Sequence, residues 1–427
     1  MSVIPLIVSV AIIISAFFPS EQKYLAQFYG RELKISGILA DDAEIKDSKI
    51  RLRVGSLRIN DSINALNCQV YIMLADDGRN YERSDSVEFT GVLTEGFGNY
   101  AGFMYLPTIV AHNKPDPPDL ALQIRNNFMA HVKDLFDAPE AGLALGYLIG
   151  DKTGMSDSLM QTLRVVGLSH VVVTSGFHLS VILNLVKRLF GKISRSAIIF
   201  AATALTLGFV AITGLNASMA RAGLMSLITL YAWYFGRKIH PGRLLLYVAA
   251  ITLWMTPSNL FNLGWQLSFA SFAGIIFLAP LITKYLYGDR EPGFVASSLI
   301  TSVAAQICCL PLSVYNFGMF SVIGIAVGLI ITPTISIVML LVFLAGTFCP
   351  PTAILANTFL KFHLGLIDVA AKQPWSALEV SPENPAIFLL YLPIVAVFIY
   401  LKFKTKHDFR PRYALDKSPE YGKIYSC

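Results

Sequence analysis

Residues 322–348 read VIGIAVGLIITPTISIVMLLVFLAGTF, a run of 27 residues without a charged side chain. An α-helix rises about 1.5 Å per residue, so a run of this length is long enough to cross the hydrocarbon core of a bilayer. A continuous apolar run of this length predicts a transmembrane helix. The segment therefore decides the class of the fold, which is that of a membrane protein.

Composition extends this prediction to most of the chain. Hydrophobic residues make up 54% of the 427 residues and charged residues 15%, and the mean hydropathy is +0.57. The first apolar run, Val3–Phe18, lacks a basic leader and a cleavage site, which predicts an uncleaved signal anchor. Leu143–Ile149 and Ala353–Ala370 are too short or too amphipathic to be predicted as spans. The other predicted spans are His170–Val186, Ala197–Thr213, Met219–Tyr234, Leu244–Met255, Trp265–Ile282, Phe294–Val314 and Ile387–Leu401.

Charge divides the chain into two blocks. Glu21 to Glu140 contains 13 Lys and Arg against 18 Asp and Glu, a balance of −5, and the remainder contains 21 against 10, a balance of +11. The loops rich in Lys and Arg and the tail from Lys402 to Arg412 are predicted to be cytoplasmic, because basic residues in short loops stay inside. The acidic block then lies outside the cytoplasmic membrane, and the C-terminus lies in the cytoplasm.

The acidic block has the pattern of a small β-domain. Alternating apolar runs at Leu33–Leu39, Ile50–Val54, Val70–Leu74 and Val87–Val92 are separated by turn clusters such as Asp76-Asp77-Gly78. Several strands in about 80 residues favour a five-stranded barrel of the OB type, a fold that binds oligonucleotides and oligosaccharides. A β-sandwich with a structural role is the alternative that periodicity leaves open.

We therefore predict a polytopic α-helical membrane protein with an extracytoplasmic all-β OB-like domain. The periodic spacing of apolar residues in Leu120–Phe136 predicts an amphipathic helix at the membrane surface. The predicted parts are a membrane anchor at 1–24, the OB-like domain at 25–115, the amphipathic interfacial helix at 116–140, a transmembrane domain at 141–402 and a basic cytoplasmic tail at 403–427.

Polar residues gather inside the apolar segments, where a lipid-facing position costs several kcal/mol. Such residues favour the interior of a helix bundle or a water-filled path. They are Asp151, Lys152, Arg164, Ser169, His170, Ser175, Gly176, His178, Arg221, Gln266 and Ser268. Other interpretations stay open: an interfacial pair for Asp151 and Lys152, a helix start for His170, and a structural clamp between Arg221 and Gln266. Ser175 and His178 also have a spacing that suits a hydrolytic pair, but no third acid is evident.

Several of these blocks resemble the ComEC family of competence proteins. Gly150-Asp-Lys-Thr-Gly154, Gly167-Leu-Ser-His and Ser175-Gly-Phe-His178 are similar to the family pattern GDKxG followed by TGLSHLLAISGLH. Ser218-Met-Ala-Arg221-Ala resembles SxxRA, and Gly264-Trp-Gln-Leu-Ser-Phe269 resembles GFQLSF. Pro311 with Asn316-Phe-Gly318 matches a later turn of the family.

The resemblance implies an inner-membrane channel that carries single-stranded DNA into the cytoplasm during natural transformation. The polar residues given above would then line the channel, because a polyanion needs cations and hydrogen-bond donors along its path. The implied partners are single-stranded DNA, an extracytoplasmic DNA-receptor protein, and a cytosolic helicase or single-strand-binding protein. Membrane lipid and further copies of the chain complete the set. A Walker A loop is absent from the sequence, so we expect a cytosolic partner to supply the driving force.

The chain departs from the family pattern at three places. It contains no HxHxDH cluster, so the metallo-β-lactamase-like domain of many members is not expected. Gly328 stands where the family has Asn before Pro333, and one N-terminal span is predicted in place of two. The five cysteines form no CxxC pair or zinc-ligand spacing, so no metal, cofactor or catalytic residue is predicted.

Lys49, Arg51 and Arg53 are the candidate DNA-binding residues of the β-domain, because alternate strand residues point to the same face. The domain is acidic overall, and a solvated strand face explains the same pattern. Two other functions stay open: a transporter of another polar or lipid-linked solute with the β-domain as a binding module, and an intramembrane enzyme that uses His170, Ser175 and His178.

Overall fold

The structure is a computed structural model that divides into two compact units, Met1–Asn127 with Ala250–Asn262, and Phe128–Ala249 with Leu263–Cys427. The residues that it describes are 24–46, 49–60, 66, 68–97, 100–151, 153–168, 179, 195–214, 217–237, 239–321, 323–373, 376–379 and 385–406.

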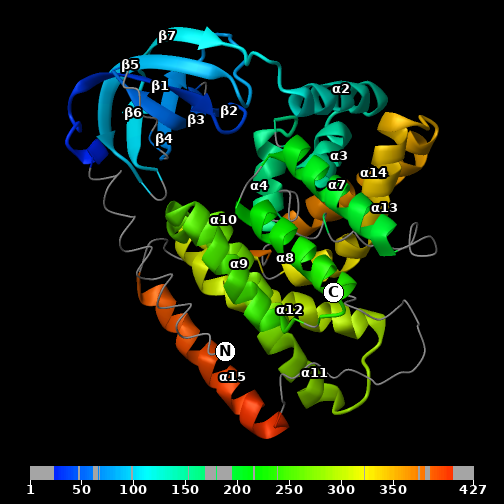
Figure 1. Cartoon of the computed structure of the whole chain (residues 1–427). Helices are drawn as coiled ribbons and strands as arrows, with labels where there is room; N and C mark the ends of the chain where they lie inside the picture. The colour runs from blue at the N-terminus through cyan, green and yellow to red at the C-terminus, as the bar shows by residue number, and fades with distance from the viewer. Residues whose placement is uncertain are drawn as a thin grey trace. The chain divides into compact units, whose positions relative to one another are not determined.

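The first unit contains a closed five-stranded barrel (Figure 1). Pairing runs from β1 to β3, β4, β6 and β5 and returns from β5 to β1, and β4–β6 is the parallel pair of this ring. This closed order is that of the predicted OB-like domain. The strands are β1 (Glu32–Leu39), β2 (Glu44–Lys46), β3 (Lys49–Ile59), β4 (Val70–Ala75), β5 (Ser86–Glu95), β6 (Gly102–Tyr105) and β7 (Thr108–Asn113).

Alternation of apolar residues builds the barrel core. Ile35, Leu52, Val54, Ile72 and Phe89 are all fully buried, and the residues between them point outwards. The strands predicted from alternation are confirmed, while β2, β6 and β7 add to them. The strands β1 and β3 approach closely at the irregularity after Ser36. A Cβ at Gly37 would lie 2.5 Å from the Val54 side chain, so this position requires glycine.

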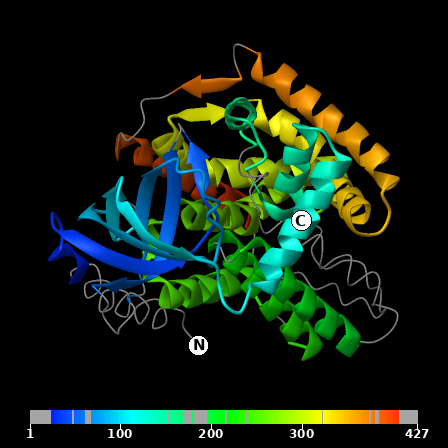
Figure 2. The ribbon, with the colours of Figure 1, turned by 90° about the horizontal axis from the view of Figure 1, so that it is seen from above.

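The second unit is built from helices. Its helices are the end of α2 (Leu120–Leu135), α3 (Glu140–Ile149), α4 (Asp157–Val165), α7 (Arg195–Thr213), α8 (Ala217–Tyr234), the start of α9 (Pro241–Met255), α10 (Leu263–Ala273), the π-helical turn η2 (Gly274–Leu278), α11 (Ala279–Tyr287), α12 (Phe294–Phe317), α13 (Gly324–Thr347), α14 (Thr352–Ala371), η3 (Pro385–Leu390) and α15 (Tyr391–Thr405). The start of α2, the end of α9 and the short helix η1 (Pro257–Phe261) belong to the first unit. Two short strands, β8 (Met319–Ser321) and β9 (Ala377–Glu379), pair antiparallel and lie side by side in Figure 2.

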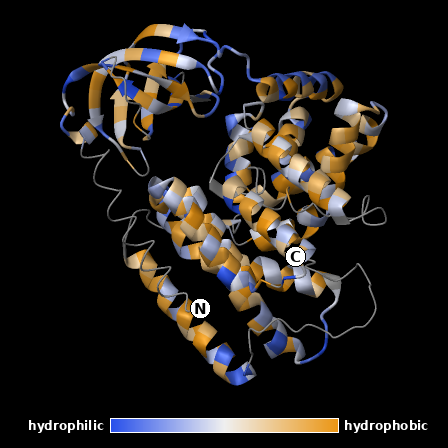
Figure 3. Cartoon of the chain, in the orientation of Figure 1, coloured by the Kyte–Doolittle hydropathy of each residue, from blue (hydrophilic) through white to orange (hydrophobic). Residues whose placement is uncertain are grey.

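Six helical segments of the described residues are long and apolar enough to cross a membrane, which makes the chain a multi-pass membrane protein. They are Ser196–Thr213, Leu263–Tyr287, Val295–Phe317, Gly324–Thr347, Thr352–Ala371 and Ala386–Thr405. In Figure 3 helix α15 is mostly orange and ends in blue, as expected for an apolar span with Lys402 and Lys404 at its end.

One sequence prediction about the spans changes in the structure. The segment Ala353–Ala370 was too amphipathic to predict as a span, yet α14 is 20 residues long and meets the length and hydropathy of one. The polar residue His363 lies on the buried face of α14, whereas the exposed face carries the apolar residues Ile354, Phe362 and Val369. An apolar exposed face is what a membrane-spanning helix presents to lipid. The predicted spans Met219–Tyr234 and Leu244–Met255 are helices α8 and α9, but neither is among the six segments. The predicted span His170–Val186 lies outside the described residues, apart from Leu179.

The apolar side of α2 packs on protein. Val132 and Phe136 are buried in the same core cluster as α13, and the rings of Phe128 and Phe343 stack with centroids 6.5 Å apart. Packing on α13 therefore accounts for the apolar residues in the second half of this helix, whereas Leu120 and Ile124 in its first half are exposed. The placement of α2 at a membrane surface stays a prediction.

Candidate functional site

A buried arginine marks the polar centre of the helical unit. Arg221 lies in the second turn of α8 and is 6% exposed. Its Nε donates to the Ser268 hydroxyl of α10 at 2.6 Å, and its Nη1 lies 3.5 Å from the Met225 sulfur. The rings of Phe269 and Phe272 face the guanidinium, with centroids 5.9 and 5.0 Å from Cζ. The cation is therefore enclosed by one hydroxyl, one thioether and two aromatic faces.

The ion pairs of the described residues do not include Arg221. Taking an unpaired charge out of water costs several kcal/mol, and ring faces return about 2 kcal/mol or less each. A guanidinium has five N–H donors in a planar fork, which suits bidentate hydrogen bonds to a carboxylate or a phosphate. Within the part of the chain that the structure describes, this site is therefore a cation without an anionic partner.

The prediction grouped Gln266 and Ser268 with Arg221, and the structure separates the two. Ser268 is buried and accepts the hydrogen bond from Arg221, whereas Gln266 is half-buried. Positions 266 and 268 are about 160° apart around α10, so they face different neighbours. The structure shows a contact of Arg221 with Ser268, and the alternative of a clamp between Arg221 and Gln266 stays a prediction.

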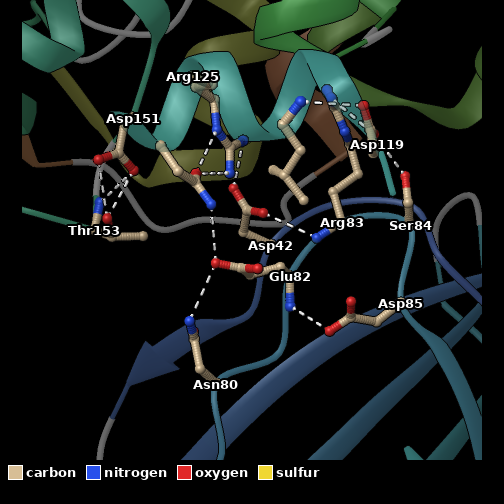
Figure 4. Close-up of polar contacts among 12 residues, drawn as sticks. Asp42, Asn80, Glu82, Arg83, Ser84, Asp85, Asp119, Arg125, Asp151 and Thr153 are labelled. Carbon is tan, nitrogen blue, oxygen red and sulfur yellow. Dashed lines mark hydrogen bonds and ion pairs between the residues drawn. The ribbon is translucent and has the colours of Figure 1, made fainter. Parts of the chain in front are cut away.

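Asp151 and Arg164 occupy local positions. Asp151 follows the αL residue Gly150 that ends α3, and its carboxylate accepts from the Thr153 N–H at 3.0 Å and from the Thr153 hydroxyl at 2.8 Å (Figure 4). Arg164 is exposed in the last turn of α4, where a cation suits the helix dipole. Neither residue makes a hydrogen bond or ion pair with Arg221, so the structure does not bring these three predicted residues together.

The remaining predicted residues of the membrane site lie outside the described part of the chain. They are Lys152, Ser169, His170, Ser175, Gly176 and His178. Their assignment to a polar path stays a prediction.

On the β-domain, Lys49, Arg51 and Arg53 alternate with buried Ile50, Leu52 and Val54, so the predicted common face is confirmed. Their charges are not equally available. Arg53 Nη1 lies 3.1 Å from Asp41 Oδ2, and its Nη2 lies 3.2 Å from Glu44 Oε1. Burial opposes the charged form, but Asp41 and Glu44 raise the pKa of Arg53 above its ordinary value. Arg53 is thus a cation already paired with two carboxylates.

Five aromatic residues beside this strand were missed by the sequence reasoning. They are Tyr71, Phe97, Tyr100, Phe103 and Tyr105, from β4, β6 and the loop between β5 and β6. Burial raises the pKa of Tyr71 and that of Tyr100, so both rings stay neutral phenols at physiological pH. The density of aromatic residues between positions 97 and 105 is the signal that would have found them.

A polar network ties the start of α2 to the barrel within the first unit (Figure 4). Asp119 caps α2 by accepting from the Leu122 N–H at 3.1 Å, and it also accepts from the Ser84 hydroxyl at 3.0 Å. Arg125 pairs with Asp42 at 2.7 Å, and the Asn126 amide donates to Glu82 at 3.1 Å.

The same network reaches the segment before α2. Buried Asp85 lies 2.8 Å from His112 Nε2 and accepts from Lys114 Nζ at 3.2 Å. The stretch from Lys114 to Asp119 is therefore held to the barrel at both ends. Among the described residues, no group of three or more His, Cys, Asp or Glu side chains has the geometry to hold a metal ion.

Comparison with known proteins gives a family match for most of the helical unit. Residues 147–405 match the family model described as Competence protein. Over 268 residues the chain is 24% identical to "ComE operon protein 3" of Bacillus subtilis (strain 168), a match that covers 58% of this chain and 34% of that relative. The chain thus spans about a third of the relative's length, and no solved structure matches. Because the family model covers more than half of the chain and includes Arg221 and Ser268, the protein belongs to the Competence protein family.

Proposed function

We propose that this protein takes part in DNA uptake, and that its helical unit forms the route by which a single DNA strand crosses the cytoplasmic membrane. Membership of the Competence protein family supports the DNA-uptake role. The β-domain lies on the outer side in this proposal, where incoming DNA arrives, and the basic end of α15 lies in the cytoplasm. The protein acts as a channel rather than as an enzyme.

The observation that carries the channel proposal is the buried Arg221. Arg221 is 6% exposed, and its guanidinium contacts among the described residues are the Ser268 hydroxyl, the Met225 sulfur and two ring faces. A permanent charge kept in an apolar bundle at such a cost favours a role in binding an anion. A phosphate in transit supplies a counter-charge, and it leaves again because a single arginine binds it weakly. An extracytoplasmic receptor delivers the strand, and a cytosolic helicase or single-strand-binding protein draws it inwards.

The test follows labelled donor DNA into the cytoplasm of cells that carry the wild-type gene, a deletion, or one of two variants. Arg221→Met keeps the length and apolar stem of the side chain but removes its charge. Arg243→Ala removes an exposed arginine near the start of α9 and is the matched control.

We expect the deletion and Arg221→Met to bind DNA outside the cell but to admit at most about a tenth of the wild-type amount. This is the size of effect expected when a charged partner of phosphate is lost. Arg243→Ala should admit DNA normally. Unchanged entry in Arg221→Met cells, with normal amounts of protein in the membrane, would remove Arg221 from the route. Unchanged entry in the deletion strain would make another polar or lipid-linked solute the cargo.

A further inference from the structure

We propose that the outer face of β3, β4 and β6 is a stacking platform for the unpaired bases of a single DNA strand, next to a cation that two acidic side chains hold in reserve. The inference rests on the proposed DNA-uptake function for the identity of its ligand. It adds a binding site in the β-domain, which lies outside the part of the chain that the family model covers.

Strand register arranges the face in rows. Arg53 on β3 is paired with Tyr71 on β4, and Tyr71 is paired with Phe103 on β6. One step along, Arg51 is paired with Met73, and Met73 with Tyr105. Each row therefore runs from a cation to an aromatic ring across neighbouring strands, with side chains about 5 Å apart along the row.

The rings form one continuous cluster. The centroid of Tyr71 lies 5.3 Å from that of Phe97, 5.1 Å from that of Tyr100 and 6.1 Å from that of Phe103. Phe103 lies 6.4 Å from Tyr105. The loop between β5 and β6 supplies Phe97 and Tyr100, so strands and loop contribute to one surface. In OB folds this strand face and this loop are the parts that bind oligomers.

The outer rings of the cluster are not needed for the barrel core. Phe97 is 55% exposed and Tyr105 is 54% exposed, whereas the core residues of the same strands, such as Ile72 and Met104, are fully buried. Cross-strand aromatic pairs stabilise a sheet, and this explains Tyr71 with Phe103. The two half-exposed rings at the rim extend the cluster into a contiguous exposed aromatic surface, and such a surface is typical of an interaction site.

Charge distinguishes the two polymers that OB folds bind. A neutral oligosaccharide stacks on rings without needing cations, but here Lys49 donates to the Tyr105 hydroxyl at 3.0 Å and lies 5.0 Å from its ring centroid. Arg51 and Arg53 stand on the same face. Rings that alternate with cations suit a chain of flat bases joined by phosphates. A duplex keeps its base faces stacked inside, so the surface selects a single strand.

Arg53 is the cation of this face that is paired with two carboxylates. Asp41 and Glu44, from the segment between β1 and β3, hold its guanidinium at 3.1 and 3.2 Å. A phosphate that reaches Arg53 must displace these two carboxylates, so they weaken binding and limit it to ligands that engage the rings at the same time. Neutralising them should therefore strengthen binding, a gain that unfolding cannot imitate.

The experiment measures binding of a fluorescent oligothymidylate to the full-length protein in detergent, with a hairpin duplex and maltohexaose as the other probes. Phe97→Ala and Tyr105→Ala remove the rim rings. Val110→Ala and Arg58→Ala are matched controls, because Val110 is an exposed apolar residue of β7 and Arg58 is an exposed cation at the far end of β3. Asp41→Asn combined with Glu44→Gln releases Arg53.

We expect the single strand to bind more tightly than the duplex, and each ring variant to weaken it about tenfold. The controls should bind like wild type. The double acidic variant should bind about fivefold more tightly at low salt, and the slope of log affinity against log salt should steepen by about 0.7, the value for one added phosphate contact on a single strand.

Equal affinity for duplex, or ring variants that bind like wild type, would overturn the platform. Tight, salt-insensitive binding of maltohexaose would make the ligand a carbohydrate. If the double variant Asp41→Asn with Glu44→Gln bound the oligonucleotide with unchanged affinity, the proposed competition of these carboxylates with phosphate for Arg53 would be overturned. The outcome is separable from that of the uptake test. If the platform failed to bind the oligonucleotide while DNA entry still depended on Arg221, the proposed function would stand without the platform. If the platform bound the oligonucleotide while DNA entry did not depend on Arg221, the platform would stand without the route past Arg221.

Discussion

The Arg221 guanidinium and the Ser268 hydroxyl form a hydrogen bond of 2.6 Å that joins α8 to α10, 47 residues apart in the chain. Both side chains are buried. The pair belongs to two sequence blocks that resemble the family pattern separately, SMARA at 218–222 and GWQLSF at 264–269. The structure shows that one block supplies the cation and the other its acceptor.

Ser268→Ala should lower the free energy of unfolding by about 1–3 kcal/mol, because it leaves the Arg221 Nε–H buried without its acceptor. In the double variant Arg221→Met with Ser268→Ala the two costs should be far from additive, since the second change removes a donor that has already lost its partner. Denaturant unfolding of the purified protein in detergent measures all three variants. Additive costs would show that the two residues do not interact.

Tyr147→Phe should leave the stability unchanged or raise it by up to about 1 kcal/mol. The Tyr147 hydroxyl is buried on α3 and has no hydrogen-bond partner among the described residues, so its loss removes a desolvation cost. Thr334→Val is the contrasting variant. The Thr334 hydroxyl lies 2.7 Å from His363 Nε2, and its removal would leave that nitrogen without this partner. Thermal unfolding should rank Tyr147→Phe above wild type or level with it, and Thr334→Val below. The opposite ranking would contradict the hydrogen bond of Thr334 with His363 and the lack of a partner for the Tyr147 hydroxyl among the described residues.

Gly142→Ala and Gly208→Ala should change stability in opposite directions. A Cβ at Gly142 would lie 2.4 Å from the Gly154 carbonyl oxygen, which is backbone and cannot swing away, whereas a Cβ at Gly208 meets nothing within 4 Å. We expect Gly142→Ala to destabilise the protein by about 1–3 kcal/mol through overpacking. Gly208→Ala should stabilise α7 by about 0.5–1 kcal/mol through helix propensity. Equal effects at the two positions, measured by unfolding in detergent, would contradict the close contact of α3 with Gly154.

Acid should weaken the attachment of α2 to the barrel. Partial burial works against the charge of Asp119, but the Leu122 N–H, the Ser84 hydroxyl and Arg83 together hold its pKa below the ordinary value. A carboxyl whose pKa is depressed on folding stabilises the folded state above its unfolded pKa of about 4, and the contribution is lost as the pH falls through the folded pKa.

The measurement compares thermal unfolding of wild type and Asp119→Asn between about pH 6 and pH 3, a window that contains the ordinary carboxyl pKa. Asparagine still caps a helix, so the variant keeps the cap but cannot titrate. We expect the variant to be less stable at pH 6 and to lose less stability than wild type as the pH falls. Parallel curves would show that Asp119 does not contribute to the acid response.

Local patterns were predictable from the sequence, and long-range pairings were not. The alternation of Ile50, Arg51 and Leu52 fixes which face each residue takes, because the period of a strand depends only on neighbours. Strand β6 has four residues and pairs in parallel with β4, so its existence depends on contacts about 30 residues away. The same reason hid the aromatic cluster: Tyr71 meets Phe97, Tyr100 and Phe103 only after the barrel closes.

The membrane part shows the same division. Apolar length predicted α13 and α15 as spans, because length and hydropathy are local properties. The partner of Arg221 was not predictable, since Gln266 and Ser268 lie on one helix and only the packing of α8 on α10 selects Ser268. The pairing of Arg53 with Asp41 and Glu44 likewise follows from the path of the segment between β1 and β3 rather than from strand alternation.

Photo-crosslinking of DNA in transit tests the central claim most directly. A photo-crosslinking amino acid replaces Phe272, whose ring lies 5.0 Å from the Arg221 guanidinium, or Phe200, which is 78% exposed on the apolar span α7. Cells taking up labelled DNA are irradiated, and the protein is isolated under denaturing conditions. We predict a covalent adduct with a single donor strand at position 272 and none at position 200. DNA entry without an adduct at position 272, or equal adducts at both positions, would contradict a route past Arg221.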